Sequence, residues 1–207
     1  MTLRAASMES PELTASDSAT GPDTIVLRDG DGKSLLCIAP GIGAIYRVVA
    51  RDPAVCSRLI EEVLRSPQAE LLPRSGGLLS NLSVLENVVL PAVYHRRFAR
   101  TQLAELVYRD FDDCGMTRAE AEELCGRAVS DLTLFERRLV ALVRALIMRP
   151  ALLVMERAFE GLASQDMQRV ALFPEYYHRS VPGGCVIMFD LAGIMCPELA
   201  TEAEVEA

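Results

Sequence analysis

Apolar residues along this chain form short, unbroken runs that are separated by longer stretches of helical periodicity. The runs at residues 24–27, 34–39, 151–155 and 185–189 have the length and the flanking breakers of β-strands. The run ALLVM at 151–155 is apolar at every position, which is typical of a strand buried on both faces of a sheet. Strands that alternate with helices predict an α/β fold with a doubly wound parallel sheet.

Helical periodicity occupies the stretches between these runs. A helix is predicted over residues 44–64, after the breaker PGIG at 40–43, with a second helix start at Asp52-Pro53. Residues 82–93 predict another helix, with a kink or an end at Pro91. A further possible strand covers residues 70–73.

Two capping boxes mark helix starts in the second half of the chain. Thr117 and Glu120 open one helix, and Thr133 and Glu136 open a long apolar helix that ends before Pro150. In a capping box, each of the two side chains bonds the backbone amide of the other residue. Both motifs therefore predict the start of a helix.

Composition along the chain predicts four regions. Residues 1–23 lack periodicity and are expected to be disordered, and residues 198–207 form a short acidic tail. Residues 24–93 and 134–197 are expected to form the α/β core. Residues 94–133 are charged and amphipathic, and they predict a small helical subdomain.

Composition and charge exclude several classes of function. A chain of 207 residues with 50% hydrophobic residues can bury the core of one ordinary domain. The formal net charge of −8 argues against a nucleic-acid partner, because phosphate backbones require clustered Lys and Arg. Six cysteines are scattered without a C-x-x-C pair, so their spacing predicts no metal site and no redox motif. The N-terminus lacks an apolar signal region and no apolar run approaches the ~20 residues of a membrane span, so we expect a soluble, cytoplasmic protein.

Two segments resemble a known family. The segment at residues 75–95, SGGLLSNLSVLENVVLPAVYH, is similar to the segment after the Q-loop in ABC-transporter ATPases. Its sequence most resembles the branch of the family that serves lipid-type transporters. RRLVALVRALIMRPALLVM at 137–155 is similar to the helix after the family's LSGGQ signature, together with the Walker B strand. The resemblance spans roughly residues 34–192. It implies a P-loop ATPase fold, in which a parallel sheet is flanked by helices and joined to a small helical subdomain, here shortened at both ends.

The phosphate loop that this resemblance implies is incomplete in either of two registers. A P-loop needs G-x-x-x-x-G-K-[ST] after a strand, so that amides, a lysine and a hydroxyl surround the phosphates. In the preferred register, residues 34–39 are the strand and the glycines are Gly41 and Gly43. Ala44 then replaces the lysine, and Ile45 replaces the hydroxyl that would bind magnesium.

The second register places the strand at residues 24–27, so that Lys33 and Ser34 complete a G-K-S ending. The helix that should follow would stop at Pro40-Gly41, and a hairpin turn is the favoured interpretation of GDGKS. If this register holds, the remaining phosphate or magnesium contacts are Lys33, Ser34 and Glu156.

The other positions at which the family keeps a chemical group also differ. Arg74 stands where the Q-loop glutamine belongs, and arginine has no acceptor for a metal. Glu156 replaces the Walker B aspartate, and Arg157 replaces the glutamate that polarises water and cannot act as a base. A local ion pair between Glu156 and Arg157 is the favoured interpretation. Phe189 precedes Asp190 where the switch histidine should stand.

The signature motif is replaced by LTLFE at residues 132–136. In the family, small residues at this helix N-terminus bind the γ-phosphate of the ATP that the partner subunit holds. Here Thr133 and Glu136 are expected to cap the helix and consume its amides, and Phe135 is expected to fill the space that glycines leave open.

These differences predict a pseudo-ATPase, a catalytically inactive subunit that acts as a structural or regulatory partner of a membrane transporter at the inner face of the membrane. The expected partners are a membrane permease, an intact ABC ATPase subunit, or both, in a homo- or heterodimer. The contact surface is expected at Leu82, Val84, Leu85, Glu86 and Asn87.

Two other interpretations remain open. The chain could be a half-active ATP-binding subunit of a heterodimeric ABC transporter, or a soluble adaptor that is unrelated to transport. No cofactor is expected, although weak binding of Mg-ATP stays open, and neither a catalytic residue nor a metal site is predicted.

Overall fold

The computed structural model describes residues 25–28, 34–38, 43–95, 100–194, 197 and 203–206. The segment at 1–23, which was expected to be disordered, lies outside the described residues, as do Lys33 and Gly41. Of the acidic tail expected at 198–207, only residues 203–206 are described, and they form a strand.

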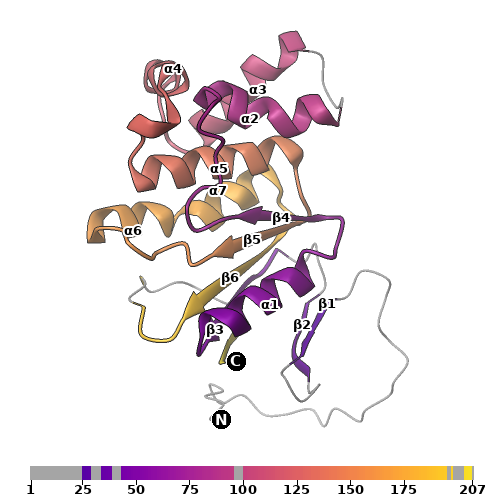
Figure 1. The fold of residues 1–207 in the computed structure, drawn as a ribbon. Helices are drawn as coiled ribbons and strands as arrows, with labels where there is room; N and C mark the ends of the chain where they lie inside the picture. Colours follow the sequence, from indigo (N-terminus) through magenta and orange to yellow (C-terminus); the bar gives the residue numbers. More distant parts are fainter. Residues whose placement is uncertain are drawn as a thin grey trace.

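A five-stranded parallel sheet forms the centre of the molecule (Figure 1). Its order is β4-β5-β6-β3-β7, and every neighbouring pair is parallel. The strands are β3 (Ile45–Ala50), β4 (Ala69–Leu72), β5 (Leu152–Glu156), β6 (Cys185–Leu191) and β7 (Ala203–Glu206). The prediction of an α/β fold with a parallel sheet is confirmed.

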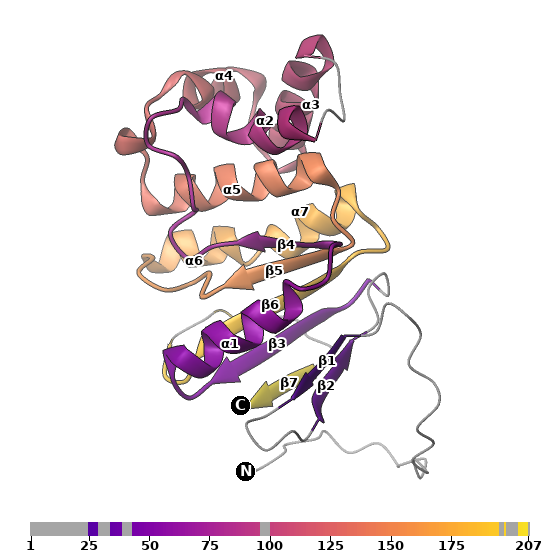
Figure 2. The same ribbon diagram turned by 45° about the vertical axis from the view of Figure 1, so that its right-hand side comes forward.

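A separate antiparallel pair consists of β1 (Ile25–Arg28) and β2 (Ser34–Ile38). Figure 2 shows this pair beside α1 (Pro53–Val63), on the side away from the other helices. Leu27 of β1 is fully buried and belongs to the same apolar cluster as α1. The two early apolar runs are therefore strands, as predicted, but they do not join the central sheet.

The prediction of a helix that begins at Ala44 is wrong. The segment forms β3, which pairs with β6 from Ile45↔Val186 to Ala50↔Leu191. Alternate side chains are buried, and β-branched residues such as Val48 favour the extended backbone. The helix begins only at Pro53, where its second start was predicted.

Helices cover both faces of the sheet. Helix α1 lies on one face, and α5 (Leu134–Met148), α6 (Ser164–Val170) and α7 (Phe173–Ser180) lie on the other. A further layer beyond α5 contains α2 (Val84–Tyr94), α3 (Arg100–Asp113) and α4 (Arg118–Gly126) (Figures 1 and 2). A short 3-10 turn, η1 (Val129–Asp131), precedes α5.

Capping residues define where several of these helices begin. Both predicted capping boxes are present, at Thr117 and at Thr133, and a third opens α2 at Ser83. Helix α2 continues past Pro91 to Tyr94, one turn beyond the predicted kink or end. None of the helices in the described ranges combines the length and the apolarity that a membrane span requires.

The hydrophobic core has two parts, one on each face of the sheet. Residues 152–155 of β5 are completely buried because their side chains alternate between the two parts. The part that faces α1 includes Val48, Leu59, Val63, Leu152 and Val154. The part that faces α5 includes Leu142, Leu146, Leu153, Met155 and Met188.

A buried tyrosine restricts the turn before β6. The hydroxyl of Tyr177 on α7 donates a hydrogen bond to the carbonyl oxygen of Pro150, at 2.8 Å, and the side chain is completely buried. A Cβ atom placed on Gly184 would lie 2.1 Å from the Tyr177 hydroxyl oxygen. The ring cannot move aside without breaking a buried hydrogen bond, so only glycine fits at this position.

We predict that Gly184→Ala lowers the free energy of unfolding by about 2 kcal/mol, as overpacking of a closed core does. Urea denaturation provides the measurement. The control is Gly126→Ala, because a Cβ at Gly126 would meet no atom within 4 Å. Equal stability of the two variants would contradict the packing described for Tyr177.

Candidate functional site

The carboxyl ends of β3, β4, β5 and β6 meet at one edge of the sheet, which we call the carboxyl edge. Ligands of doubly wound α/β proteins bind at this edge, because the loops and helix N-termini that follow the strands converge there. The residues that follow these four strands therefore constitute the candidate site.

The loop between β3 and α1 contains only Arg51 and Asp52. The Asp52 Oδ1 atom accepts hydrogen bonds from the backbone N–H groups of Ala54, at 2.8 Å, and Val55, at 3.0 Å. The first helical residue is Pro53, which has no N–H group to offer. A carboxylate of the chain itself thus occupies the N-terminus of α1.

This two-residue loop stands where a P-loop would connect its strand to its helix. Phosphate loops surround an anion with successive backbone amides, but no glycine occurs from Ala44 to Ser75 to allow such a curve. The Asp52 carboxylate also repels a second anion at the same position. Both registers predicted for the loop are therefore wrong, because neither places it between β3 and α1.

The residues of the two predicted registers lie elsewhere. Gly43, with φ of 71°, and Ala44 lie at the amino end of β3, which is opposite to the carboxyl edge. Ile45 is the first residue of β3, and Ser34 is the first residue of β2. The N-cap Asp52 with Pro53, together with the β-branched residues Ile45, Val48 and Val49 before them, is the sequence signal that could have located the loop.

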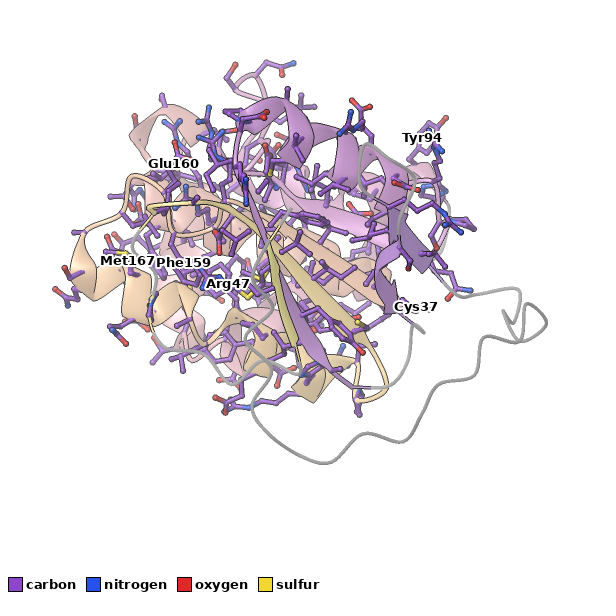
Figure 3. The ribbon with its side chains drawn as sticks, turned by 90° about the horizontal axis from the view of Figure 1, so that it is seen from below. Cys37, Arg47, Tyr94, Phe159, Glu160 and Met167 are labelled. Carbon is purple, nitrogen blue, oxygen red and sulfur yellow. The ribbon has the colours of Figure 1, made fainter. Side chains whose placement is uncertain are left out.

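Three arginines and two glutamates lie at the carboxyl edge, and we call them the arginine–glutamate cluster. One ends β5, three lie in the loops after β4 and β5, and one lies on α5. The members of the cluster are Arg74, Arg138, Glu156, Arg157 and Glu160. The backbone N–H of Arg74 donates to Glu156 Oε2 at 3.2 Å, and its guanidinium donates to Glu160 Oε1 at 3.1 Å. Figure 3 labels Glu160, on the loop after β5.

Arg157 and Glu160 form an ion pair within the loop after β5. Arg157 has a φ of 46°, a left-handed conformation that is costly for a residue with a side chain, and its N–H donates to the Phe189 carbonyl at 2.7 Å. The prediction that Arg157 pairs with Glu156 is therefore wrong, because Arg157 pairs with Glu160. The left-handed backbone turns Arg157 toward Glu160, and Glu156 accepts the amide of Arg74 instead.

Arg138 links the cluster to α5 and is completely buried. Its Nε donates to the Arg74 carbonyl at 2.8 Å, and one terminal nitrogen donates to the Glu160 carbonyl at 2.7 Å. Burial lowers the pKa of Arg138 to about 10, although Glu160 opposes the shift. Sequence analysis missed this residue, although its spacing from Phe135 and Leu142 (i, i+3, i+7) places it on the buried face of α5.

Phe189, at the position where a switch histidine was expected, is completely buried in β6 and faces the α1 side of the sheet. The next residue, Asp190, is also buried, and Arg47 Nε on β3 donates to its Oδ2 at 3.0 Å. Both positions thus contribute to the interior of the sheet.

The N-terminus of α5, where the signature motif was expected, is closed by its own cap. Glu136 Oε2 accepts the backbone N–H of Thr133 at 2.7 Å, and Arg127 donates to Glu136 Oε1 at 2.6 Å. Partial burial alone would raise the pKa of Glu136, but the bonds from Thr133 and the pair with Arg127 outweigh it and lower the pKa. The carboxylate of Glu136 is therefore already paired with the guanidinium of Arg127.

Phe135, which was expected to fill the space that glycines leave open in the signature motif, turns its side chain into the core. Its side chain is 5% exposed and packs in the core, 6.3 Å from the Phe173 ring centroid. The Arg169 guanidinium lies 3.6 Å from the centroid of the Phe135 ring. The aromatic side chain turns inward because the apolar contacts of α6 and α7 are available on that side.

A groove of about 420 Å³ lies between α2 and α3. Its lining residues are Leu82, Leu85, Glu86, Val89, Leu90, Val93, Leu103 and Ala104. At the end of α2 beside it, Tyr94 is 81% exposed and points outward (Figure 3). Three of the five residues predicted for a partner surface, Leu82, Leu85 and Glu86, therefore line one surface groove.

The other two residues of that prediction are wrong, because Val84 and Asn87 are completely buried. Asn87 Oδ1 accepts the backbone N–H of Leu79 at 2.7 Å, and its Nδ2 donates to the Leu79 carbonyl at 3.0 Å. Asn87 thus fixes the loop that leads into α2. Because side chains of a helix point in successive directions around its axis, residues adjacent in sequence can face the groove and the core in turn.

Solved structures that resemble this molecule are ABC cassettes. The molecule matches CbiO1 from Clostridium perfringens, described as part of the ABC transporter complex CbiONQ, with a TM-score of 0.63 and 14% identity over 88% of this chain and 85% of that chain. It also matches the dimeric bacterial ABC transporter cassette MJ0796, with a TM-score of 0.59 and 13% identity over 81% of this chain and 85% of that chain. This chain has the ABC-cassette fold. The resemblance is confirmed at the level of fold, while no protein-family model and no curated protein matches the sequence.

A second MJ0796 structure, described as a post-hydrolysis state bound to ADP and Pi, has a TM-score of 0.55 at 14% identity over 81% of this chain and 85% of that chain. The residues of the present cassette do not fit such a ligand. At the edge where phosphates would lie, Asp52 occupies the amides of α1, and Arg157 offers only donors to a magnesium ion or a water.

We predict that Asp52→Ala destabilises the cassette by about 1 kcal/mol, because two amides at the N-terminus of α1 lose their acceptor. Asp52→Asn keeps the acceptor oxygen and should retain most of the stability. Thermal unfolding of both variants beside the wild type provides the measurement. If Asp52→Ala unfolds at the same temperature as the wild type, the Asp52 carboxylate does not stabilise the N-terminus of α1.

Proposed function

We propose that this chain is a non-hydrolysing subunit, which uses the ABC-cassette fold as a structural or regulatory partner of a membrane permease or of an intact ABC ATPase subunit. The observation that carries this proposal is the arginine–glutamate cluster, which fills the carboxyl edge with ion pairs of the chain itself. The proposed location is the cytoplasmic face of a membrane.

The chemistry of the carboxyl edge supports the absence of hydrolysis. Phosphoryl transfer to water needs amides and a cation around the phosphates, a ligand for magnesium, and a group that orients the water. Asp52 occupies the first position, and Glu156 stands at the second, where its Oε2 already accepts the backbone N–H of Arg74. Arg157 stands at the third position and has no lone pair with which to accept a proton.

The surface of α2 supports a role in binding a partner. Leu79, Leu90, Val93 and Tyr94 are exposed apolar or aromatic side chains on and beside this helix. A groove with an apolar lining suits an amphipathic helix that inserts its apolar face. CbiO1 is part of a transporter complex, and for the present chain we propose an equivalent assembly through the groove.

A charge in the groove should prevent assembly. We predict that the wild-type chain, purified from gently solubilised membranes, carries along a multi-span permease, an intact ATPase subunit, or both, and that Leu90→Glu does not. Leu172→Glu is the matched control, because both leucines are 42% exposed and Leu172 lies outside the groove. Mass spectrometry of the co-purifying proteins provides the measurement.

Recovery of the wild-type chain alone in the soluble fraction would contradict a transporter subunit. Equal recovery of partners with Leu90→Glu and Leu172→Glu would place the contact outside the groove.

A further inference from the structure

The loop at residues 73–82, which connects β4 to α2, is held by two arginines of α5. Arg138 donates to the carbonyl of Arg74 at 2.8 Å. Six residues later along α5, Arg144 donates to the carbonyls of Gly77 at 2.8 Å and Gly76 at 3.3 Å. These carbonyls belong to three of the five residues after β4, so the loop follows the surface of α5.

Close packing also restricts this loop. Gly76 has a φ of 84°, and a Cβ at this position would lie 2.7 Å from the Arg137 carbonyl oxygen. At the far end of the loop, Asn87 binds both backbone groups of Leu79. Arginines therefore hold the start of the loop against α5, and an asparagine holds its end against α2.

Burying the charged side chain of Arg138 costs free energy of folding. It lies on the buried face of α5, where an apolar side chain could pack without the loss of hydration that a buried guanidinium suffers. One of its terminal nitrogens, Nη1, has no hydrogen-bond partner among the described residues. The two bonds that it does form join the loops after β4 and β5, which points to a role in positioning.

We propose that Arg138 and Arg144 form a clamp that fixes the 73–82 loop, and with it the first turn of α2, in one position without any bound nucleotide. This inference deepens the proposed function and rests on it in one respect, since it assumes that the α2 groove is the docking surface. The clamp would then keep the groove in a single conformation. Donors with a full positive charge suit this task, because their bonds to carbonyls are stronger than neutral ones.

Hydrogen exchange of the isolated full chain, measured without nucleotide, tests the clamp. We predict that amides at residues 74–88 exchange at least about tenfold faster in Arg138→Met and in Arg144→Met than in the wild type. Amides of β5 and β6 should keep their rates. The control is Arg118→Met on α4, which removes a surface arginine that pairs with Glu105 and Glu122 and should leave residues 74–88 unchanged.

Two results would overturn the clamp. One is unchanged exchange at residues 74–88 in both variants, and the other is an equal acceleration across the loop and the central strands, which would mean global destabilisation only. If Arg138→Met does not fold, the half-buried Arg144 decides the question alone. Because the test uses the isolated chain, a failed co-purification would overturn the proposed function without altering these exchange rates.

Discussion

The architecture of the carboxyl edge depends on the buried guanidinium of Arg138. Its two hydrogen bonds tie the carbonyls of Arg74 and Glu160 to α5, which brings together the loops after β4 and β5. Those loops and the last residue of β5 carry the remaining members of the cluster, so the ion pairs at the surface rely on the bonds underneath. A buried charge of this kind is tolerated only where its donors find good acceptors.

The parallel sheet with its flanking helices and the carboxyl edge, where ligands bind in doubly wound α/β proteins, are separable parts of this cassette. The sheet and α5 retain an apolar core on both faces of β5. At the edge, by contrast, a capping carboxylate stands at α1, the arginine–glutamate cluster follows β4 and β5, and a closed capping box begins α5. Stability can thus be preserved by packing while the groups that would surround a phosphate change their roles.

How much could be predicted depended on how local the physical signal was. The buried strand β5 and the capped start of α5 follow from patterns within a few residues, and both were predicted correctly. β3 was missed because its apolar residues suit a helix as well as a strand, and pairing with β6 and β7 decides between them. Arg138 was missed because its acceptors are carbonyls 22 and 64 residues away in the chain.

Whether this cassette hydrolyses ATP is decided by the release of phosphate from Mg-ATP, measured for the purified chain and for Glu156→Gln. Both samples should stay at the background of a protein-free control, because Asp52 and Arg157 occupy the positions at which phosphate and catalytic base would act. Phosphate release by the wild type that depends on magnesium and is abolished by Glu156→Gln would refute a non-hydrolysing subunit.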